Sequence, residues 1–244
     1  MRGRNLAWIL VVLSVSATRL EAACIEPAQL AHSAVSITRY FDEAERAAHP
    51  GVIGTSGTAW FLSPTTIVTA EHVSTGMMLT TEWKSLDISE GDDTRSMPAR
   101  VARVTGRGGE KLAVLELQSE FPQARRAAIR TVPLAPEDQV VTLAYPDRRP
   151  RVVGGRFVKY GEDERLAGAA LLEMFDGNDR LAVDHGASGA PVYDCGGRIA
   201  AVVTTVITQS LPGWSGHMRT STPWGTPNVL SVPIQALEEY SEAR

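Results

Sequence analysis

The segment Gly186-Ala187-Ser188-Gly189-Ala190-Pro191 is the most informative stretch of this chain. Its glycines predict a tight turn that exposes the serine hydroxyl and points the amides of Gly186 and Ser188 at a developing oxyanion. A hydrolase nucleophile elbow has Gly-x-Ser-x-Gly between a strand and a helix, whereas Ala190 replaces the second glycine here and Pro191 begins a strand-like run. The serine is therefore predicted to lie on a turn that leads into a β-hairpin.

A histidine upstream of this turn has the position of a general base. Thr69-Ala70-Glu71-His72 closes an apolar, strand-like run. Serine is a poor nucleophile at its own pKa, so chemistry at Ser188 requires an imidazole that takes the hydroxyl proton. We therefore expect His72 and Ser188 to form a base and nucleophile pair.

Three sequence blocks resemble the trypsin-like, or chymotrypsin-fold, serine peptidases, and their bacterial members in particular. The blocks are Gly57 to Pro64 with Ile67 to Val73, Leu112 to Leu117, and the serine turn with Gly197 to Val203 behind it. The resemblance spans residues 33 to 236. It implies an all-β fold of two six-stranded antiparallel β-barrels, with the active site between them and a short C-terminal helix.

The N-terminal pattern and the resemblance together divide the chain, and the resemblance predicts its activity. Residues 1–23 are predicted to be a signal peptide, 24–125 a first barrel that carries His72, and 126–244 a second barrel that carries Ser188. The implied activity is that of a serine endopeptidase, which acts on protein or peptide substrates. The alternative is a weak or inactive pseudopeptidase that binds peptides.

The third member of the catalytic triad departs from the family pattern. The family places an acid immediately before the second block, where Lys111 stands, and the nearest carboxylate is Glu110. A shift of one residue along a strand turns the side chain to the opposite face, so Glu110 serves if a bulge re-aims it. The other candidates are Asp87, Asp92 and Asp93, or a serine and histidine without an acid.

Two further family positions carry predictions. Ala187 stands where most members have an acid or amide that pairs with a new amino terminus, so the resemblance implies a site formed on folding. Ala182 lies at the predicted floor of the specificity pocket, and Thr204, Thr205 and Val206 lie along its wall. These residues predict a preference for small or medium apolar side chains.

The N-terminus has the pattern of a secretory signal peptide. Arg2 and Arg4 precede an apolar stretch from Leu6 to Val15, and small residues follow at Ala17 and Ala23. The apolar stretch is shorter than the roughly 20 residues that span a bilayer, so a retained anchor is the alternative. Cleavage after either alanine changes the net charge from −4 to −6. We expect an exported protein, periplasmic or secreted, with no stable membrane span after cleavage and no electrostatic basis for binding nucleic acid.

The two cysteines, Cys24 and Cys195, are expected to form a disulfide, as is common in exported proteins. Lipid attachment at Cys24 and free thiols are the alternatives, although Glu21 stands where lipidation sites usually have leucine.

No His-Glu-x-x-His motif occurs and the cysteines are 171 positions apart, so we expect no metal and no cofactor. The remaining histidines are expected to be solvated or, for His185, near substrate without acting as a base: His32, His49, His185 and His217.

The hydrophobic pattern predicts the order of strands and loops. Composition is that of an ordinary globular chain, with 244 residues, 43% hydrophobic and 21% charged. Polar surface loops are predicted for Asp42 to Gly54 and Ser85 to Ser96, and the connection between the halves for Ser119 to Ala135. Strands are predicted for Ser33 to Phe41, Ala59 to Leu62, Thr66 to Thr69, Ala99 to Thr105, Leu112 to Leu117, Gln139 to Pro146, Arg151 to Tyr160, Leu171 to Phe175, Arg180 to Val183, Val192 to Asp194, Arg198 to Ile207 and Asn228 to Ile234. Gln209 to Gly225 is predicted to be a long loop whose tryptophans pack the barrel edge, and Gln235 to Ala243 a closing helix.

Overall fold

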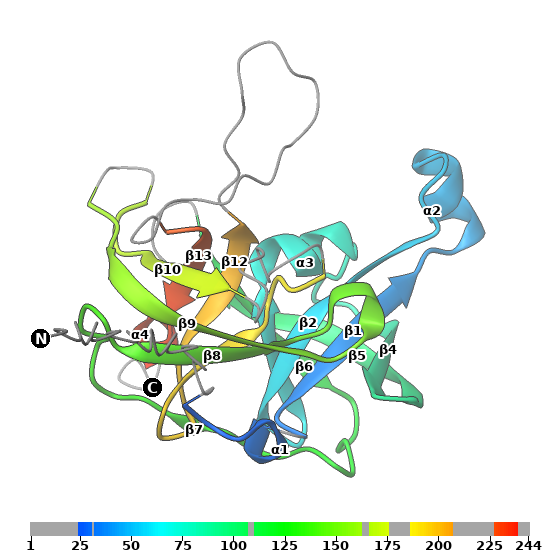
Figure 1. The fold of residues 1–244 in the computed structure, drawn as a ribbon. Helices are drawn as coiled ribbons and strands as arrows, with labels where there is room; N and C mark the ends of the chain where they lie inside the picture. The colour runs from blue at the N-terminus through cyan, green and yellow to red at the C-terminus, as the bar shows by residue number, and fades with distance from the viewer. Residues whose placement is uncertain are drawn as a thin grey trace, which may run out of the picture.

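The computed structural model describes residues 24–30, 32–106, 110–162, 166–175, 186–206 and 227–238. Several predictions lie outside these ranges and are not addressed by the structure. They are the signal peptide, the strand Arg180 to Val183 with Ala182, His185 and His217, the loop from Gln209 to Gly225, and the helix beyond Glu238. The described chain is all-β, as predicted (Figure 1).

The first half forms a closed antiparallel barrel with strand order β1-β2-β3-β6-β5-β4. Its strands are β1 (Ala34–Tyr40), β2 (Gly54–Ser63), β3 (Thr66–Ala70), β4 (Lys84–Glu90), β5 (Asp93–Thr105) and β6 (Leu112–Leu117). Successive side chains of a strand face opposite sides, so Phe61 packs inside this barrel while its neighbour Trp60 packs outside it. Phe61 stacks on Phe121 inside the barrel, with ring centroids 5.2 Å apart. Alternate side chains of one strand therefore belong to two apolar clusters, one inside the first barrel and one outside it.

The second half also closes into a six-stranded antiparallel barrel, because β11 pairs with both β8 and β12. Its strands are β8 (Gln139–Ala144), β9 (Arg151–Tyr160), β10 (Ala170–Phe175), β11 (Pro191–Asp194), β12 (Arg198–Val206) and β13 (Val229–Pro233). The short strand β7 (Ala128–Ile129) lies in the connection between the halves and adds to β12 in parallel. The short helix α4 (Gln235–Glu238) follows the last strand. The predicted architecture of two six-stranded barrels and a C-terminal helix is confirmed.

Two predicted loops are regular elements in the structure. Asp42 to Gly54 contains helix α2 (Glu43–Ala48), which a capping box stabilises: Asp42 accepts from the Glu45 amide, and Glu45 accepts from the Asp42 amide. Ser85 to Ser96 forms most of the β4–β5 hairpin, because Leu86 and Ile88 alternate with polar residues and are fully buried. In both cases a high content of charged and hydroxyl residues concealed a regular pattern.

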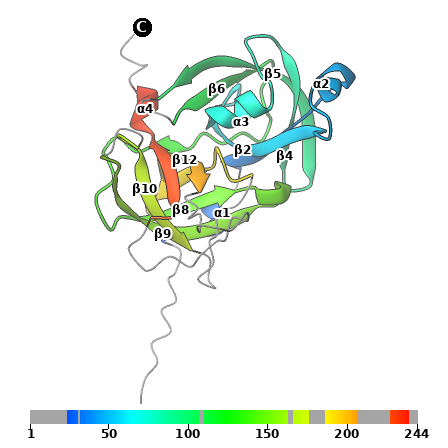
Figure 2. The same cartoon turned by 90° about the horizontal axis from the view of Figure 1, so that it is seen from above.

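The barrels pack against each other through a shared apolar cluster. The first barrel contributes Trp60, Val68 and Val114, and the second contributes residues such as Tyr193 and Val202. Hydrogen bonds cross this interface. Burial raises the pKa of Tyr145 to about 12, with a smaller contribution from Glu90, so its hydroxyl stays protonated and donates to the Ala34 carbonyl at 3.1 Å. Figure 2 shows the two barrels side by side, with helix α3 (Glu71–Gly76) on the first one.

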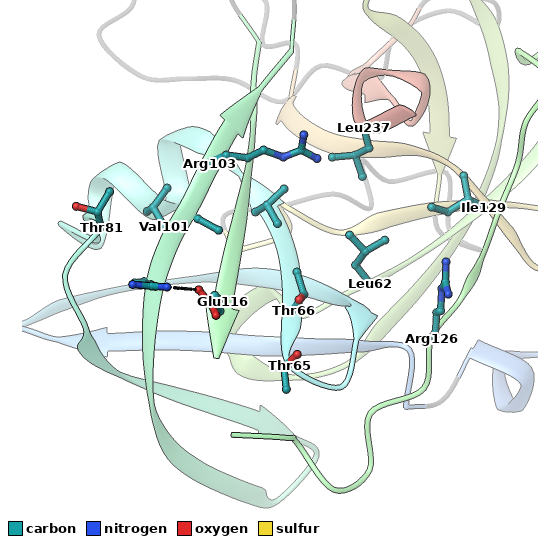
Figure 3. Close-up of a pocket in the computed structure, with 13 residues that line it drawn as sticks. Leu62, Thr65, Thr66, Thr81, Val101, Arg103, Glu116, Arg126, Ile129 and Leu237 are labelled. Atoms are coloured by element: carbon teal, nitrogen blue, oxygen red, sulfur yellow. Dashed lines mark hydrogen bonds and ion pairs between the residues drawn. The ribbon is translucent and has the colours of Figure 1, made fainter. Parts of the chain in front are cut away.

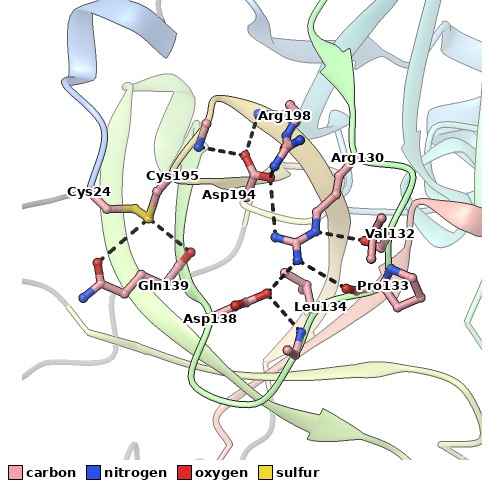
Figure 4. Close-up of polar contacts among 12 residues, drawn as sticks. Cys24, Arg130, Val132, Pro133, Leu134, Asp138, Gln139, Asp194, Cys195 and Arg198 are labelled. Carbon is pink, nitrogen blue, oxygen red and sulfur yellow. Dashed lines mark hydrogen bonds and ion pairs between the residues drawn. A yellow bond between two sulfur atoms is a disulfide. The ribbon is translucent and has the colours of Figure 1, made fainter.

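A disulfide and an ion-pair network support the β11–β12 turn (Figure 4). The predicted bond between Cys24 and Cys195 is present, with Cα atoms 5.1 Å apart, and joins the N-terminal segment to the second barrel. The adjacent Asp194 is buried and bonds the guanidinium groups of Arg198 at 2.7 Å and Arg130 at 3.4 Å. Burial raises the pKa of this carboxyl, but hydrogen bonds from Arg198 and from nearby amides outweigh burial and hold it below its ordinary value.

Candidate active site

Ser188 lies on a turn between two glycines in the left-handed region. Gly186 has φ +93° and Gly189 has φ +91°, a region that residues with a Cβ rarely adopt. Ala187 and Ala190 are fully buried in the second barrel, while Ser188 is only partly buried. The turn leads directly into β11 and the β11–β12 hairpin. The local structure predicted for the serine segment is the one observed.

His72 is the second residue of helix α3, which follows β3 without an intervening loop. The amide of Glu71 donates to the Lys111 carbonyl at 2.9 Å, which ties the start of the helix to β6. Val73 and Met77 anchor the other face of α3 in the core of the first barrel. His72 itself is exposed, so the fold presents its imidazole at the surface of the first barrel.

The serine turn of the second barrel packs on the strands of the first barrel that lead to His72. The Thr58 amide on β2 donates to the Ser188 carbonyl at 2.9 Å. A Cβ at Gly189 would collide with the Thr58 carbonyl and the Thr69 hydroxyl, and would lie 3.1 Å from the Ala70 nitrogen. Ala70 precedes His72 by two residues. The barrels therefore bring the serine turn to the base of the histidine helix.

The Ser188 hydroxyl donates to the Thr204 carbonyl at 2.9 Å. In the described part of the chain, the His72 imidazole has no hydrogen bond to Ser188 or to another side chain. Within that same part, no residue accepts from the amides of Gly186 or Ser188. Among the described residues, the amides of Gly186 and Ser188 thus have no protein acceptor. The Ser188 hydroxyl is hydrogen-bonded to β12.

The candidate acids lie in different parts of the first half of the chain. Glu110 is half-buried and lines a cavity of about 200 Å³ beside α4, together with residues such as Val232 and Gln235. Lys111 is exposed. Asp87 lies in β4 opposite Thr38 and Ser96, and Asp92 and Asp93 lie at the β4–β5 turn. Among the described residues, none of these carboxylates is hydrogen-bonded to His72.

A second and larger cavity, of about 830 Å³, lies away from the predicted catalytic residues (Figure 3). It is lined by Thr66 of β3, Arg103 of β5 and Glu116 of β6, and also by Ile129 of the connection and Leu237 of α4. Neither His72 nor Ser188 lines it. This larger cavity therefore does not coincide with the candidate site, which lies where the two barrels meet.

The described ranges contain neither a metal-binding cluster nor a helix that could span a membrane. Within them, no three His, Cys, Asp or Glu side chains are grouped so that they could bind a metal ion. Of the helices in these ranges, none is both long and apolar enough to cross a bilayer.

Comparison with known proteins identifies the class and then the family. The crystal structure of the active form of the Rv3671c protease from M. tuberculosis has a TM-score of 0.60 at 18% identity, covering 87% of this chain and 80% of that chain. Its inactive form has a TM-score of 0.58 at 16% identity, covering 91% and 96%. The HtrA-type protease AlgW, solved with a tripeptide, has a TM-score of 0.56 at 14% identity, covering 88% of this chain and 61% of that chain. At these identities the similarity establishes the fold, which is that of the trypsin-like serine proteases.

The sequence establishes the family as well. Residues 57–202 match the trypsin-like peptidase domain, and the chain belongs to that family. No curated protein sequence matches the chain. The predicted resemblance to trypsin-like serine peptidases is confirmed.

One residue beside the site was missed by sequence reasoning. Thr58 lies in the first block that resembles the family, and its amide and hydroxyl both bond to the serine turn. A threonine in a β-strand is unremarkable by pattern, because the contacts that distinguish it come from a segment 128 residues away. No feature of the sequence could have indicated this role.

Proposed function

We propose that this protein is an exported serine endopeptidase in which Ser188 is the nucleophile and His72 the general base. The observation that carries the proposal is the contact of the serine turn with β2 and β3 at the base of α3. Membership of the trypsin-like peptidase family supports the same reaction class. Peptide-bond hydrolysis by this pair needs no cofactor.

The reaction follows from the groups that the fold brings together. The Ser188 hydroxyl leaves the Thr204 carbonyl by rotation about one side-chain bond and attacks the substrate carbonyl while His72 takes its proton. The amides of Gly186 and Ser188 stabilise the oxyanion of the tetrahedral intermediate. His72 then gives the proton to the leaving amine, and a water molecule hydrolyses the acyl-enzyme by the same steps.

The third member of the triad is proposed to be Glu110, reoriented when the site is occupied. An acid that accepts from the second ring nitrogen keeps the base in the productive tautomer and stabilises imidazolium. Glu110 precedes Lys111, whose carbonyl bonds the helix that carries His72. A Glu110→Gln variant with activity reduced by about 10⁴ would support this role, whereas unchanged activity would favour a serine and histidine pair without an acid.

The remaining predictions belong to the same proposal. Residues 1–23 are a signal peptide that directs export to the periplasm or the medium, 24–125 form the unit that carries His72, and 126–244 the unit that carries Ser188. Substrates are proteins or peptides. Thr204 and Thr205 on β12 favour a small or medium apolar side chain at the primary site.

A peptide-binding pseudopeptidase is the second candidate function. It is favoured by the hydrogen bond from Ser188 to Thr204 instead of to His72, and by the absence of a described carboxylate bonded to His72. The exposed Lys111 at the family's acid position agrees with it.

Labelling with a fluorophosphonate probe separates the two candidates. The mature protein is compared with Ser188→Ala and His72→Ala variants whose folding is verified by thermal denaturation. A peptidase labels strongly, and both variants lose the label. A folded wild-type protein that does not label would contradict the peptidase proposal and direct attention to bound peptides.

A further inference from the structure

The serine turn cannot maintain its own conformation. Gly186 and Gly189 both have φ near +90°, and glycine populates many backbone states, so the sequence of the turn leaves several geometries open. Within the turn there is one hydrogen bond, from the Ala190 amide to the Ala187 carbonyl at 2.9 Å. The orientation of the peptide groups around Ser188 must therefore come from contacts outside the turn.

Thr58, on β2 of the first barrel, supplies two of these contacts. Its hydroxyl donates to the Gly186 carbonyl at 2.7 Å, and its amide donates to the Ser188 carbonyl at 2.9 Å. One residue therefore restrains the peptide groups on both sides of Ala187 and Ser188. Each peptide group is planar, so these bonds fix the two groups that flank the one carrying the Ser188 amide, and they thereby restrict the direction in which that amide points.

Thr58 is itself held rigidly. It is fully buried, and its carbonyl accepts from the Thr69 hydroxyl at 2.7 Å. Its own hydroxyl also accepts from the Tyr145 amide at 3.0 Å. The hydroxyl thus donates its single hydrogen to the Gly186 carbonyl of the serine turn, and one of its lone pairs accepts from the Tyr145 amide at the end of β8.

The Tyr145 contact places a third segment against the turn. A Cβ at Gly186 would lie 3.1 Å from the Tyr145 carbonyl and 3.3 Å from the Pro146 Cα, so the end of β8 limits the space beside Gly186. The Thr58 hydroxyl lies between these two segments of the second barrel and bonds both. Only a short side chain with one donor and a free lone pair can make this bridge.

We propose that Thr58 is the positioning residue of the oxyanion site, and that its hydroxyl holds the Gly186–Ser188 turn in the geometry that stabilises the transition state. The proposal rests on the proposed peptidase function. Thr58 acts through Gly186 and does not touch the reacting atoms. The activity of a site built from the second barrel thus depends on a hydroxyl of the first.

The test compares Thr58→Val, Thr58→Ser and the control Thr142→Val. Valine matches threonine in shape but leaves the Gly186 carbonyl and Tyr145 amide unbonded, whereas serine restores both hydrogen bonds. Thr142 is also fully buried and also donates one hydroxyl bond to a backbone carbonyl, that of Pro191 at 2.8 Å. Its substitution reproduces the loss of a buried bond without touching the Gly186 carbonyl.

The measurements are the concentration dependence of fluorophosphonate labelling, thermal denaturation, and amide hydrogen exchange. We expect Thr58→Val to lower the maximal labelling rate by about 10- to 100-fold, with the half-saturating probe concentration little changed, because a misplaced oxyanion site weakens transition-state stabilisation. Thr58→Ser should stay within a few-fold of wild type. Thr142→Val should lose thermal stability to a similar extent as Thr58→Val and keep its labelling rate.

Each contrary outcome has a distinct meaning. Equal labelling of wild type and a folded Thr58→Val variant would overturn the positioning role while leaving the peptidase function intact. Equal losses of labelling in Thr58→Val and Thr142→Val would reduce Thr58 to a structural residue, which also overturns it. If wild type does not label at all, the proposed function fails, and exchange of the Tyr145 amide, faster in Thr58→Val and protected in Thr58→Ser, still reports whether the hydroxyl holds these segments.

Discussion

The two halves of the candidate site differ in whether the other barrel helps to support them. Helix α3, which carries His72, is bonded entirely by its own barrel among the described contacts. Arg39 donates to the Met77 carbonyl at 2.9 Å, Thr55 donates to the Gly76 carbonyl at 3.0 Å, and the start of the helix bonds to Lys111. The serine turn instead receives two hydrogen bonds from Thr58 of the other barrel.

This difference indicates how such a site becomes active. The histidine segment is complete once the first barrel has folded, since its bonds and its core contacts are local to that barrel. The serine turn is held by β12 of its own barrel, where the Gly189 amide donates to the Val203 carbonyl at 2.7 Å, and also by Thr58 of the other barrel. Catalytic competence would then report on barrel packing, and the base and the nucleophile should respond differently to mutation.

The largest expected effect on labelling and stability comes from adding a side chain at Gly189. In Gly189→Ala the methyl group would collide with the Thr58 carbonyl and the Thr69 hydroxyl at φ +91°, so we expect loss of labelling and a large loss of stability, about 4 kcal/mol or more. Gly51→Ala is the control, because Gly51 has φ +86° and open space around it. That variant should cost about 1 to 2 kcal/mol. Similar melting temperatures for the two would show that the barrels do not press on the turn.

Removal of the disulfide should affect stability without affecting the turn. Cys195 lies at the end of β11 opposite Ser188, and its bond to Cys24 closes a separation of 171 residues. For a Cys24→Ser/Cys195→Ser variant, we expect urea denaturation to give a free energy of unfolding about 2 to 4 kcal/mol lower than that of wild type. Its labelling rate at 25 °C should equal that of wild type. Reduced labelling of the folded variant would show that the N-terminal segment supports the serine turn.

The buried Asp194 should make the second barrel sensitive to acid. Asp194→Asn keeps one acceptor oxygen but breaks the ion pairs with Arg130 and Arg198, so we expect a loss of about 2 to 3 kcal/mol at pH 7. Because the folded-state pKa is lowered, this stabilisation is present above the unfolded pKa of about 3.9 and is lost as the pH falls below it. Urea denaturation between pH 3 and pH 7 measures both effects.

Glu116→Gln provides the comparison for Asp194. Its partner Arg100 lies at 2.7 Å, but both side chains are about 40% exposed (39% and 42%), so the loss should be below about 1 kcal/mol. A pH dependence in Asp194→Asn as steep as that of wild type would show that other carboxyls dominate acid unfolding.

An effect smaller than that at Asp194 is expected for an ion pair of the first barrel. Glu45 bonds Arg39, which in turn bonds the end of α3, and the hydrogen bond from Arg39 is the main reason that the pKa of Glu45 is lowered to about 2. Glu45→Gln should cost about 1 to 2 kcal/mol at pH 7. This contribution disappears as the pH falls from above 4 towards 2. Glu43→Gln, an exposed residue of the same helix, should have little effect. A loss of labelling in a stable Glu45→Gln variant would contradict the view that α3 is held by many independent contacts.

Much of the fold could be predicted from the sequence, because a strand that is buried on one face alternates apolar and polar residues. The bounds of β6 and β9 match the predicted Leu112 to Leu117 and Arg151 to Tyr160. The β4–β5 hairpin was missed because hydroxyl and acidic residues surround the few apolar residues that point inward. Helix α2 was missed because it buries no side chain and owes its start to the Asp42 cap.

The candidate site could be predicted only in part. The serine turn and its oxyanion amides follow from local glycines, and His72 follows from the run that precedes it. The sequence could not identify the acid of the triad, because a position in a strand determines the face on which a carboxylate lies but not the residue that it contacts. Glu110, beside α4, illustrates this limit.

By itself the sequence indicated the all-β class, the two barrels and the peptidase family, and it supplied the candidates for nucleophile and base, Ser188 and His72. These properties depend on neighbours along the chain, where periodicity and turn residues act over a few positions. Only the tertiary structure decided which barrel supports which catalytic segment and that the Thr58 hydroxyl bridges Gly186 and Tyr145. Such contacts join residues about a hundred positions apart, and their energy depends on distances that exist only after the barrels have packed.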